Sequence, residues 1–276
     1  MGCGGSTDGA RMNKHDSKAS MKVRQLLIDH NVEKDPKVSY NYNLSLDCKR
    51  KNHMEFVEEW KSTQFPTIKS VAILKVASIT SKDAQALDRF LEGSLSTSMK
   101  HFYLSSGHSS SYPDIQSFET GLSSFLGAVE EEVFFEGLSI TSSQLQNIIQ
   151  AAHKVKNLTF FNCKIDIDDT FHVDKNLKFK IETLDLCCSY YPKSSKFMDK
   201  QKFEKFSKAW GMSHLKQSLR VVHITSYKKE EKTEPGNEEK QILDKYGFNN
   251  ADLHCDKDWP IPSSQSQVSN RKSSHW

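Results

Sequence analysis

The sequence predicts an α/β fold in which parallel strands alternate with helices, and two patterns in its central part indicate this. A motif of three apolar residues, with two variable positions after the first and one after the second, recurs along the chain. Between its copies, apolar residues fall three or four positions apart, as on one face of an amphipathic helix. A strand followed by a helix, repeated in one phase, implies parallel strands with helices on one side.

The apolar motif marks six expected strands of one continuous sheet. They lie near residues 70–74, 101–105, 132–136, 157–161, 183–187 and 220–224. Their central apolar residues are Val71, Phe102, Val133, Leu158, Leu184 and Val222. Residues 42–44 are a candidate for a degenerate earlier copy.

Four amphipathic stretches are expected to form the helices between these strands. They cover residues 81–95, 114–129, 142–155 and 202–215. Starting signals precede three of them, at Thr80-Ser81, Pro113-Asp114 and Thr141-Ser142. A Thr, Ser or Asp side chain at such a position can accept a hydrogen bond from a first-turn N–H group.

The repeated units resemble leucine-rich repeats of a divergent, ribonuclease-inhibitor type, whose consensus runs L-x-x-L-x-L-x-x-N/C-x-L. The best match runs from Val155 through Leu158 and Phe160 to Cys163, which falls in the Asn/Cys position. A small side chain is needed there, to turn inward and cap backbone groups as the strand bends into its loop. The resemblance covers about residues 68–226 and implies a leucine-rich-repeat-like solenoid with helices on the convex side. An ordinary α/β domain with crossover helices is the alternative.

Composition divides the chain into five parts. Residues 1–20 are expected to be a disordered, acylated leash, because they contain few apolar side chains. Residues 21–66 are read as an N-terminal cap with a possible degenerate repeat, and residues 67–227 as the repeat solenoid. Residues 228–258 are read as a linker and C-terminal cap, since a solenoid needs shielded ends. Residues 259–276 are expected to be a disordered, Ser-rich tail.

Charge and cysteine usage limit the classes of function. The 38 Lys and Arg nearly balance the 35 Asp and Glu, so the net charge of +3 predicts no nucleic-acid partner. No apolar run approaches the length of a membrane span, and the first twenty residues lack the apolar core of a secretory signal. Six cysteines without C-x-x-C spacing fit reduced thiols. A cytoplasmic location is therefore expected.

The first six residues match the acylation motif M-G-x-x-x-[ST]. Gly2 is the predicted myristoylation acceptor, and Cys3 beside it is a candidate for palmitoylation. A single myristoyl chain binds membranes with only about 10⁴ M⁻¹, so stable anchoring needs the second chain on Cys3. The sequence thus predicts attachment to the cytosolic face of a membrane.

No catalytic residues, metal site or cofactor are expected. Neither the P-loop pattern nor G-x-G-x-x-G occurs. None of the 11 histidines pairs with a cysteine at zinc-ligand spacing. The sequence therefore predicts a protein that is not an enzyme, although an enzyme on an ordinary α/β sheet remains an alternative.

The residues expected to bind a partner lie between the two inward apolar positions of each strand. In the repeat phase these face the concave surface; they include Tyr103, Phe134, Thr159, Asp185 and His223. Tyr103 and Phe134 are expected to be exposed neighbours, and such aromatic side chains anchor interfaces. The substitution Thr159→Ala is expected to leave the free energy of unfolding nearly unchanged. Alternatively, Phe134 lies in a strand covered by helices on both faces.

These observations predict a membrane-tethered intracellular scaffold or adaptor that binds a protein partner through a leucine-rich-repeat-like surface. The acyl groups would hold it at the membrane surface, and the leash would space the sheet away from it. A soluble cytosolic adaptor or substrate-recognition subunit of the same fold is the first alternative. An α/β enzyme is the second.

Overall fold

The computed structural model describes residues 42–59, 68–93, 99–107, 112–187, 200–225 and 237–256. These residues form one α/β fold built on an eight-stranded sheet. Its strands are β1 (Tyr42–Asp47), β2 (Ile68–Leu74), β3 (Met99–Ser105), β4 (Val129–Glu136), β6 (Asn157–Phe161), β8 (Thr183–Cys187), β9 (Val221–Thr225) and β10 (Asp252–Asp256). Every neighbouring pair is parallel, and the strands follow one another in space in the order of the sequence. The expected single parallel sheet is confirmed.

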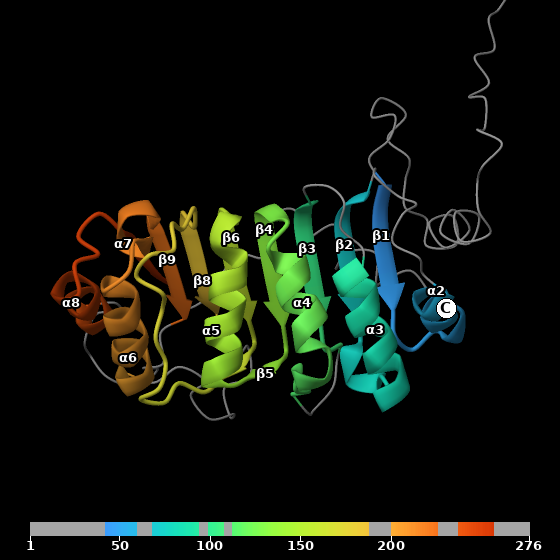
Figure 1. Cartoon of the computed structure of the whole chain (residues 1–276). Coiled ribbons are helices and arrows are strands. Elements are labelled where there is room, and N and C mark those ends of the chain that lie inside the picture. Colours follow the sequence, from blue (N-terminus) through green and yellow to red (C-terminus); the bar gives the residue numbers. More distant parts are fainter. Residues whose placement is uncertain are drawn as a thin grey trace, which may run out of the picture.

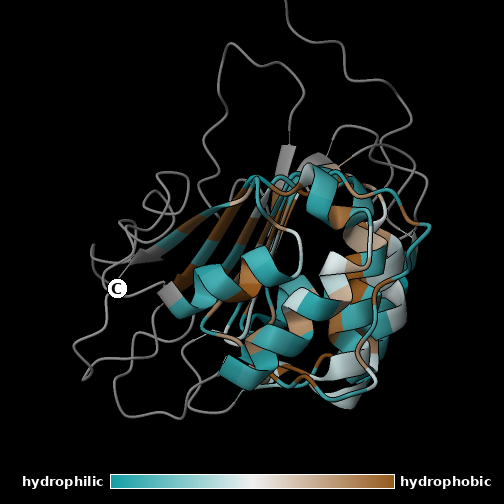
Figure 2. Ribbon diagram, turned by 90° about the vertical axis from the view of Figure 1, so that its left-hand side faces the viewer, coloured by the Kyte–Doolittle hydropathy of each residue, from teal (hydrophilic) through white to brown (hydrophobic). Residues whose placement is uncertain are grey.

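The helices form a second layer on one face of the sheet (Figures 1 and 2). They are α2 (Lys51–Glu59), α3 (Ser81–Gly93), α4 (Glu119–Leu126), α5 (Ser142–Ala151), α6 (Lys200–Gly211), α7 (Leu215–Ser218) and α8 (Asn237–Lys245). Between β6 and β8, residues 166–182 contain no helix. Asp168 and Asp174 instead each accept a hydrogen bond from the N–H two residues on, which closes turns.

Two of the three predicted starting signals begin their helices, whereas the helix expected over residues 114–129 begins only at Glu119. At α5, the Thr141 hydroxyl accepts the Gln144 N–H at 3.4 Å, and the Gln144 side chain accepts the Thr141 N–H at 2.9 Å. Thr80 and Asp83 exchange the same pair of bonds at α3. These reciprocal bonds satisfy N–H groups that have no partner within the helix. Asp114 accepts the Gln116 N–H at 2.7 Å, but this bond starts the short 3-10 turn Gln116–Phe118 that precedes α4.

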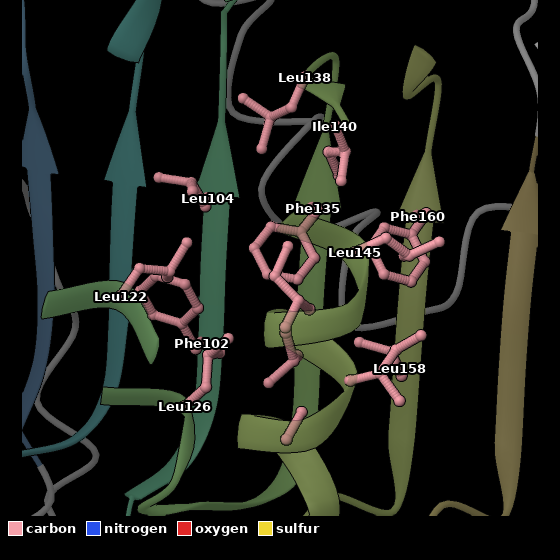
Figure 3. Close-up of a cluster of buried hydrophobic side chains, with 14 of the residues drawn as sticks. Phe102, Leu104, Leu122, Leu126, Phe135, Leu138, Ile140, Leu145, Leu158 and Phe160 are labelled. Atoms are coloured by element: carbon pink, nitrogen blue, oxygen red, sulfur yellow. The ribbon is translucent and has the colours of Figure 1, made fainter. Parts of the chain in front are cut away.

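The register between strands aligns the apolar motif across the whole sheet. One row, paired in sequence, holds Leu44, Val71, Phe102, Val133, Leu158, Leu184, Val222 and Leu253. A second inward row contains Leu104, Phe135 and Phe160. Figure 3 shows side chains of both rows beside those of α4 and α5. The two layers thus share one apolar core.

The loop after β6 contains a buried thiol that bonds to two backbone carbonyl groups. Cys163 is 2% exposed, and its thiol donates to the carbonyl oxygens of Phe135 at 3.6 Å and Phe161 at 3.4 Å. The capping role expected for this position is therefore confirmed at Cys163. Next to this position, the short strands β5 (Ser139–Ile140) and β7 (Lys164–Ile165) pair in parallel. The loops that follow β4 and β6 therefore stack in the same way as the strands.

The turns that leave the strands repeat a left-handed conformation. The residue directly after the strand has a φ of 61° at Lys75, 69° at Gly137 and 50° at Asn162. A Cβ atom at Gly137 would lie 2.2 Å from the Ser106 Oγ of the neighbouring turn. Glycine suits this turn because it adopts a positive φ without strain, and a side chain there would require the Ser106 hydroxyl to move.

The sheet extends beyond residues 67–227 in both directions. β1 lies in the segment read as an N-terminal cap, and β10 pairs with β9 in the segment read as a C-terminal cap. Both strands lack an apolar residue at the first position of the motif, which is Asn41 in one copy and Asn250 in the other. Because this apolar residue is missing, the sequence pattern did not identify β10 and identified β1 only as a candidate.

Truncating a central inward residue is expected to destabilise the fold strongly. Leu158→Ala and Leu184→Ala should each lower the free energy of unfolding by about 2–5 kcal/mol, because both side chains are fully buried. Denaturant melts measure this. A loss below about half a kcal/mol in either variant would mean that the side chain does not face the core.

Candidate functional site

The face of the sheet opposite the helices, which we call the outward face, carries three rows of side chains. Alternation along each strand puts these residues on the side opposite the core. The middle row holds Ser45, Ala72, Tyr103, Phe134, Thr159, Asp185, His223 and His254. The register therefore brings the five residues proposed for partner binding into one row on neighbouring strands.

Two flanking rows complete the outward face. The row toward the strand starts contains Ser70, His101, Glu132, Asn157, Thr183, Val221 and Asp252. The row toward the strand ends contains Asp47, Leu74, Ser105, Glu136 and Phe161. Polar and charged groups dominate both rows, in contrast to the apolar inward rows.

Three aromatic rings stack across the centre of the outward face. The ring centroids of Tyr103 and Phe134 lie 5.2 Å apart, and those of Phe134 and Phe161 lie 6.1 Å apart. Because its two neighbours cover its faces, Phe134 is only 5% exposed. The expectation that Phe134 is exposed is wrong, whereas Tyr103 and Phe161 are half-buried and keep accessible surface.

Glu136 is held at the end of the aromatic stack by two hydroxyl groups. The Tyr103 hydroxyl and the Ser105 hydroxyl, the latter at 2.9 Å, both donate to Glu136 Oε2. Burial, together with the nearby Glu136 charge, raises the pKa of Tyr103, so its hydroxyl stays protonated and remains a donor. The carboxylate is thereby fixed beside the rings, with a negative charge on the outward face.

Asp185 lies at the centre of a second polar cluster. Its Oδ2 accepts the Thr159 hydroxyl at 3.0 Å, and His223 Nε2 lies 3.6 Å from its Oδ1. The rings of His223 and His254 follow, with centroids 4.9 Å apart. Asp185 is 8% exposed, and its Oδ1 accepts no hydrogen bond within the described part of the chain. Burial, and to a lesser degree the charge of Glu132, raise the pKa of Asp185 to about 6, although the hydrogen bond from Thr159 acts in the opposite direction.

The order of groups in this cluster does not activate a nucleophile. The carboxylate lies between the hydroxyl and the imidazole, so Thr159 and His223 are two strands, or about 10 Å, apart. A hydroxyl nucleophile needs a base within hydrogen-bond reach. In the described ranges, no three His, Cys, Asp or Glu side chains are placed to hold a metal ion.

A small apolar cavity lies on the other side of the sheet, between α6 and the strands. It has a volume of about 10 Å³, and its lining includes Leu184, Phe206 and Trp210. This is about the room that one water molecule needs. None of the residues proposed for partner binding reaches it.

The sequence pattern missed three residues that contribute to the outward face. Phe161 and Glu136 lie two positions beyond the middle row on their strands, so the same alternation could have placed them. His254 lies on β10, which the pattern did not identify. Gly2 and Cys3, the predicted lipidation sites, lie outside the described residues. Among the helices that the structure describes, none has the length and hydropathy to cross a bilayer.

Comparison with known proteins adds no family to this geometry. No protein-family model matches the sequence, and no curated protein matches it either. The outward face and the N-terminal motif are therefore the features from which a function can be argued.

Thr159→Ala is expected to destabilise the fold, contrary to the expectation from its outward position. The side chain is buried, and its loss would leave both oxygens of Asp185 without a hydrogen bond in the described region. The cost should be about 1–3 kcal/mol in denaturant melts. Thr159→Ser keeps the hydroxyl and should recover most of that loss; equal losses in both variants would assign it to the methyl group.

Asp185→Asn is expected to stabilise the protein at neutral pH and to lose that effect in acid. The folded-state pKa of about 6 lies above the usual 3.8, so the folded protein binds this proton more tightly. In the parent protein, protonated Asp185 contributes its full share to the free energy of unfolding below pH 4. That contribution is lost as the pH rises through 6. The variant's advantage should therefore reach roughly 2–3 kcal/mol at pH 8 and vanish near pH 4.

Thermal melts across this pH range test the prediction. A His223→Gln background serves as the control, because it removes the imidazole that titrates in the same range. A pH-independent difference between Asp185→Asn and the parent protein would show that Asp185 ionises normally.

Proposed function

We propose that this chain is a membrane-tethered intracellular scaffold or adaptor that binds a protein partner. In this proposal its fold is a leucine-rich-repeat-like solenoid with the helices on the convex side. Acyl groups on Gly2 and Cys3 hold it at the cytosolic face of a membrane, and the outward face of the sheet binds the partner.

The observation that carries the proposal is the order of the strands. Eight parallel strands follow one another in space as they do in sequence, and the helices lie on one face (Figure 1). In such a stack each unit contacts its neighbours, and one sheet face remains for binding. Repeat proteins use this extended face to bind other proteins.

Details of the units agree with a repeat. The thiol of Cys163 caps two carbonyl groups at the consensus position, and Lys75, Gly137 and Asn162 share the left-handed turn conformation. Neither feature is needed by a sheet with unrelated connections. The shared turn conformation is expected if the units are copies of one structural element, whereas the thiol cap is a feature of one unit, since Val76, Gly107 and Leu138 stand at the equivalent positions before it.

The chemistry of the outward face supports a protein partner. Tyr103 and Phe161 supply accessible aromatic surface, and Glu136 supplies an oriented charge beside them. Aromatic side chains rimmed by polar groups are typical of protein interfaces. Carboxylates in the same rows disfavour a nucleic-acid partner, because phosphate groups would be repelled.

The membrane tether depends on two residues outside the fold. Gly2→Ala removes the acceptor for the myristoyl group, so the protein should move from the membrane fraction to the soluble fraction. Cys3→Ser leaves one acyl chain, so membrane binding should become weak and reversible. Fractionation of cells that express C-terminally tagged protein measures both effects, since an N-terminal tag would block Gly2.

Neither substitution should alter the melting temperature, which controls for effects on folding. If wild type and Gly2→Ala divide equally between the membrane and soluble fractions, the tether is wrong. The chain would then be a soluble cytosolic adaptor with the same binding face.

A further inference from the structure

The outward face is acidic although the chain as a whole is not. Its three rows, as given above, contain the carboxylates Asp47, Glu132, Glu136, Asp185 and Asp252. No lysine or arginine stands in those rows, and the other ionisable groups there are the tyrosine and three histidines. The whole chain carries +3. The distribution of charge therefore sets this face apart from the rest of the molecule.

Within the described ranges, four of these five carboxylates are not paired with a lysine or arginine. Asp47 is compensated, because it pairs with Lys75 and with Arg50. Glu132, Glu136 and Asp252 form no ion pair with a lysine or arginine in the described ranges, and neither does Asp185. Glu132 and Asp185 also repel each other. A cationic partner would relieve that repulsion.

The aromatic stack ends at a ring that is available to a partner. On the β2 side, the neighbour of Tyr103 in the middle row is Ala72, whose methyl group is too small to cover the ring. The Glu136 carboxylate is hydrogen-bonded to the Tyr103 hydroxyl. A planar guanidinium can stack on an aromatic face and also pair with a carboxylate, whereas an ammonium group does the first less well.

From this arrangement we infer that the outward face binds an arginine-bearing, basic segment of a protein. This inference deepens the proposed function and rests on it. One arginine stacks on Tyr103 and pairs with Glu136, and further basic side chains lie against Glu132 and Asp185. Anionic lipid and nucleic acid carry the wrong charge for this face, so the partner is a polypeptide.

Three fluorescent twelve-residue peptides serve as probes of the full chain. Each has four charged residues in a Gly-Ser background, and these are all Arg, all Lys or all Glu. Fluorescence anisotropy at low and high salt measures their affinities. The arginine peptide should bind most tightly, the lysine peptide several-fold more weakly and the glutamate peptide not at all, with binding weakened by salt.

Substitutions on the outward face locate the binding. Glu136→Gln and Glu132→Gln should each weaken the arginine peptide about three- to tenfold, which corresponds to roughly 0.6–1.4 kcal/mol. Glu92→Gln, on the exposed side of α3, is the matched control and should change nothing. Tyr103→Leu should weaken the arginine peptide more than the lysine peptide, a difference that a loss of fold would not produce.

The outcomes separate this inference from the function on which it rests. Equal affinity for all three peptides, or loss of binding in Glu92→Gln as large as in Glu136→Gln, overturns the arginine-binding face. The membrane tether and the binding of some other protein would still stand. Binding that appears only after residues Arg11, Lys14, Lys18, Lys22 and Arg24 are neutralised would keep the arginine-binding face but overturn a separate protein as its occupant. The face would then be assigned to the chain's own N-terminal segment.

Discussion

The alignment of inward apolar residues from strand to strand is the constraint on which the rest of the structure depends. A shift of one residue in any pairing would turn the inward row of that strand to the outward face. Burial of Leu158 and Leu184 against the helices therefore fixes the register on both sides of each strand. The same register brings Thr159 beside Asp185 and Tyr103 beside Phe134, so the core determines which groups meet on the opposite face.

The periodic part of the fold could be predicted from the sequence, because burial of one face imposes a regular spacing of apolar residues. Where that spacing fails, as at Asn250 before β10, the strand was missed. The middle row of the outward face also followed from the pattern. Its environments did not, since the burial of Phe134 depends on how the neighbouring rings pack. The raised pKa of Asp185 likewise depends on contacts between separate strands.

The two proposed activities are physically independent. The proposed attachment depends on acyl groups at Gly2 and Cys3, whereas the proposed partner binding depends on rows of side chains ordered by the sheet. A cluster of carboxylates is costly to hold together, because like charges repel and partial burial strengthens the repulsion. The polar contacts of Asp185 and Glu136 stabilise that arrangement in the free protein, and a cationic partner would stabilise it further.

Hydroxyl-radical footprinting of the full chain, with and without a bound protein partner, tests the central claim about the outward face most directly. The method reports the solvent exposure of individual side chains. Binding should protect Tyr103, Phe161 and His254, while Met212, which is 53% exposed just after α6, should react equally in both states. Protection of Met212 with unchanged oxidation of the other three would place the partner away from the outward face and contradict the account.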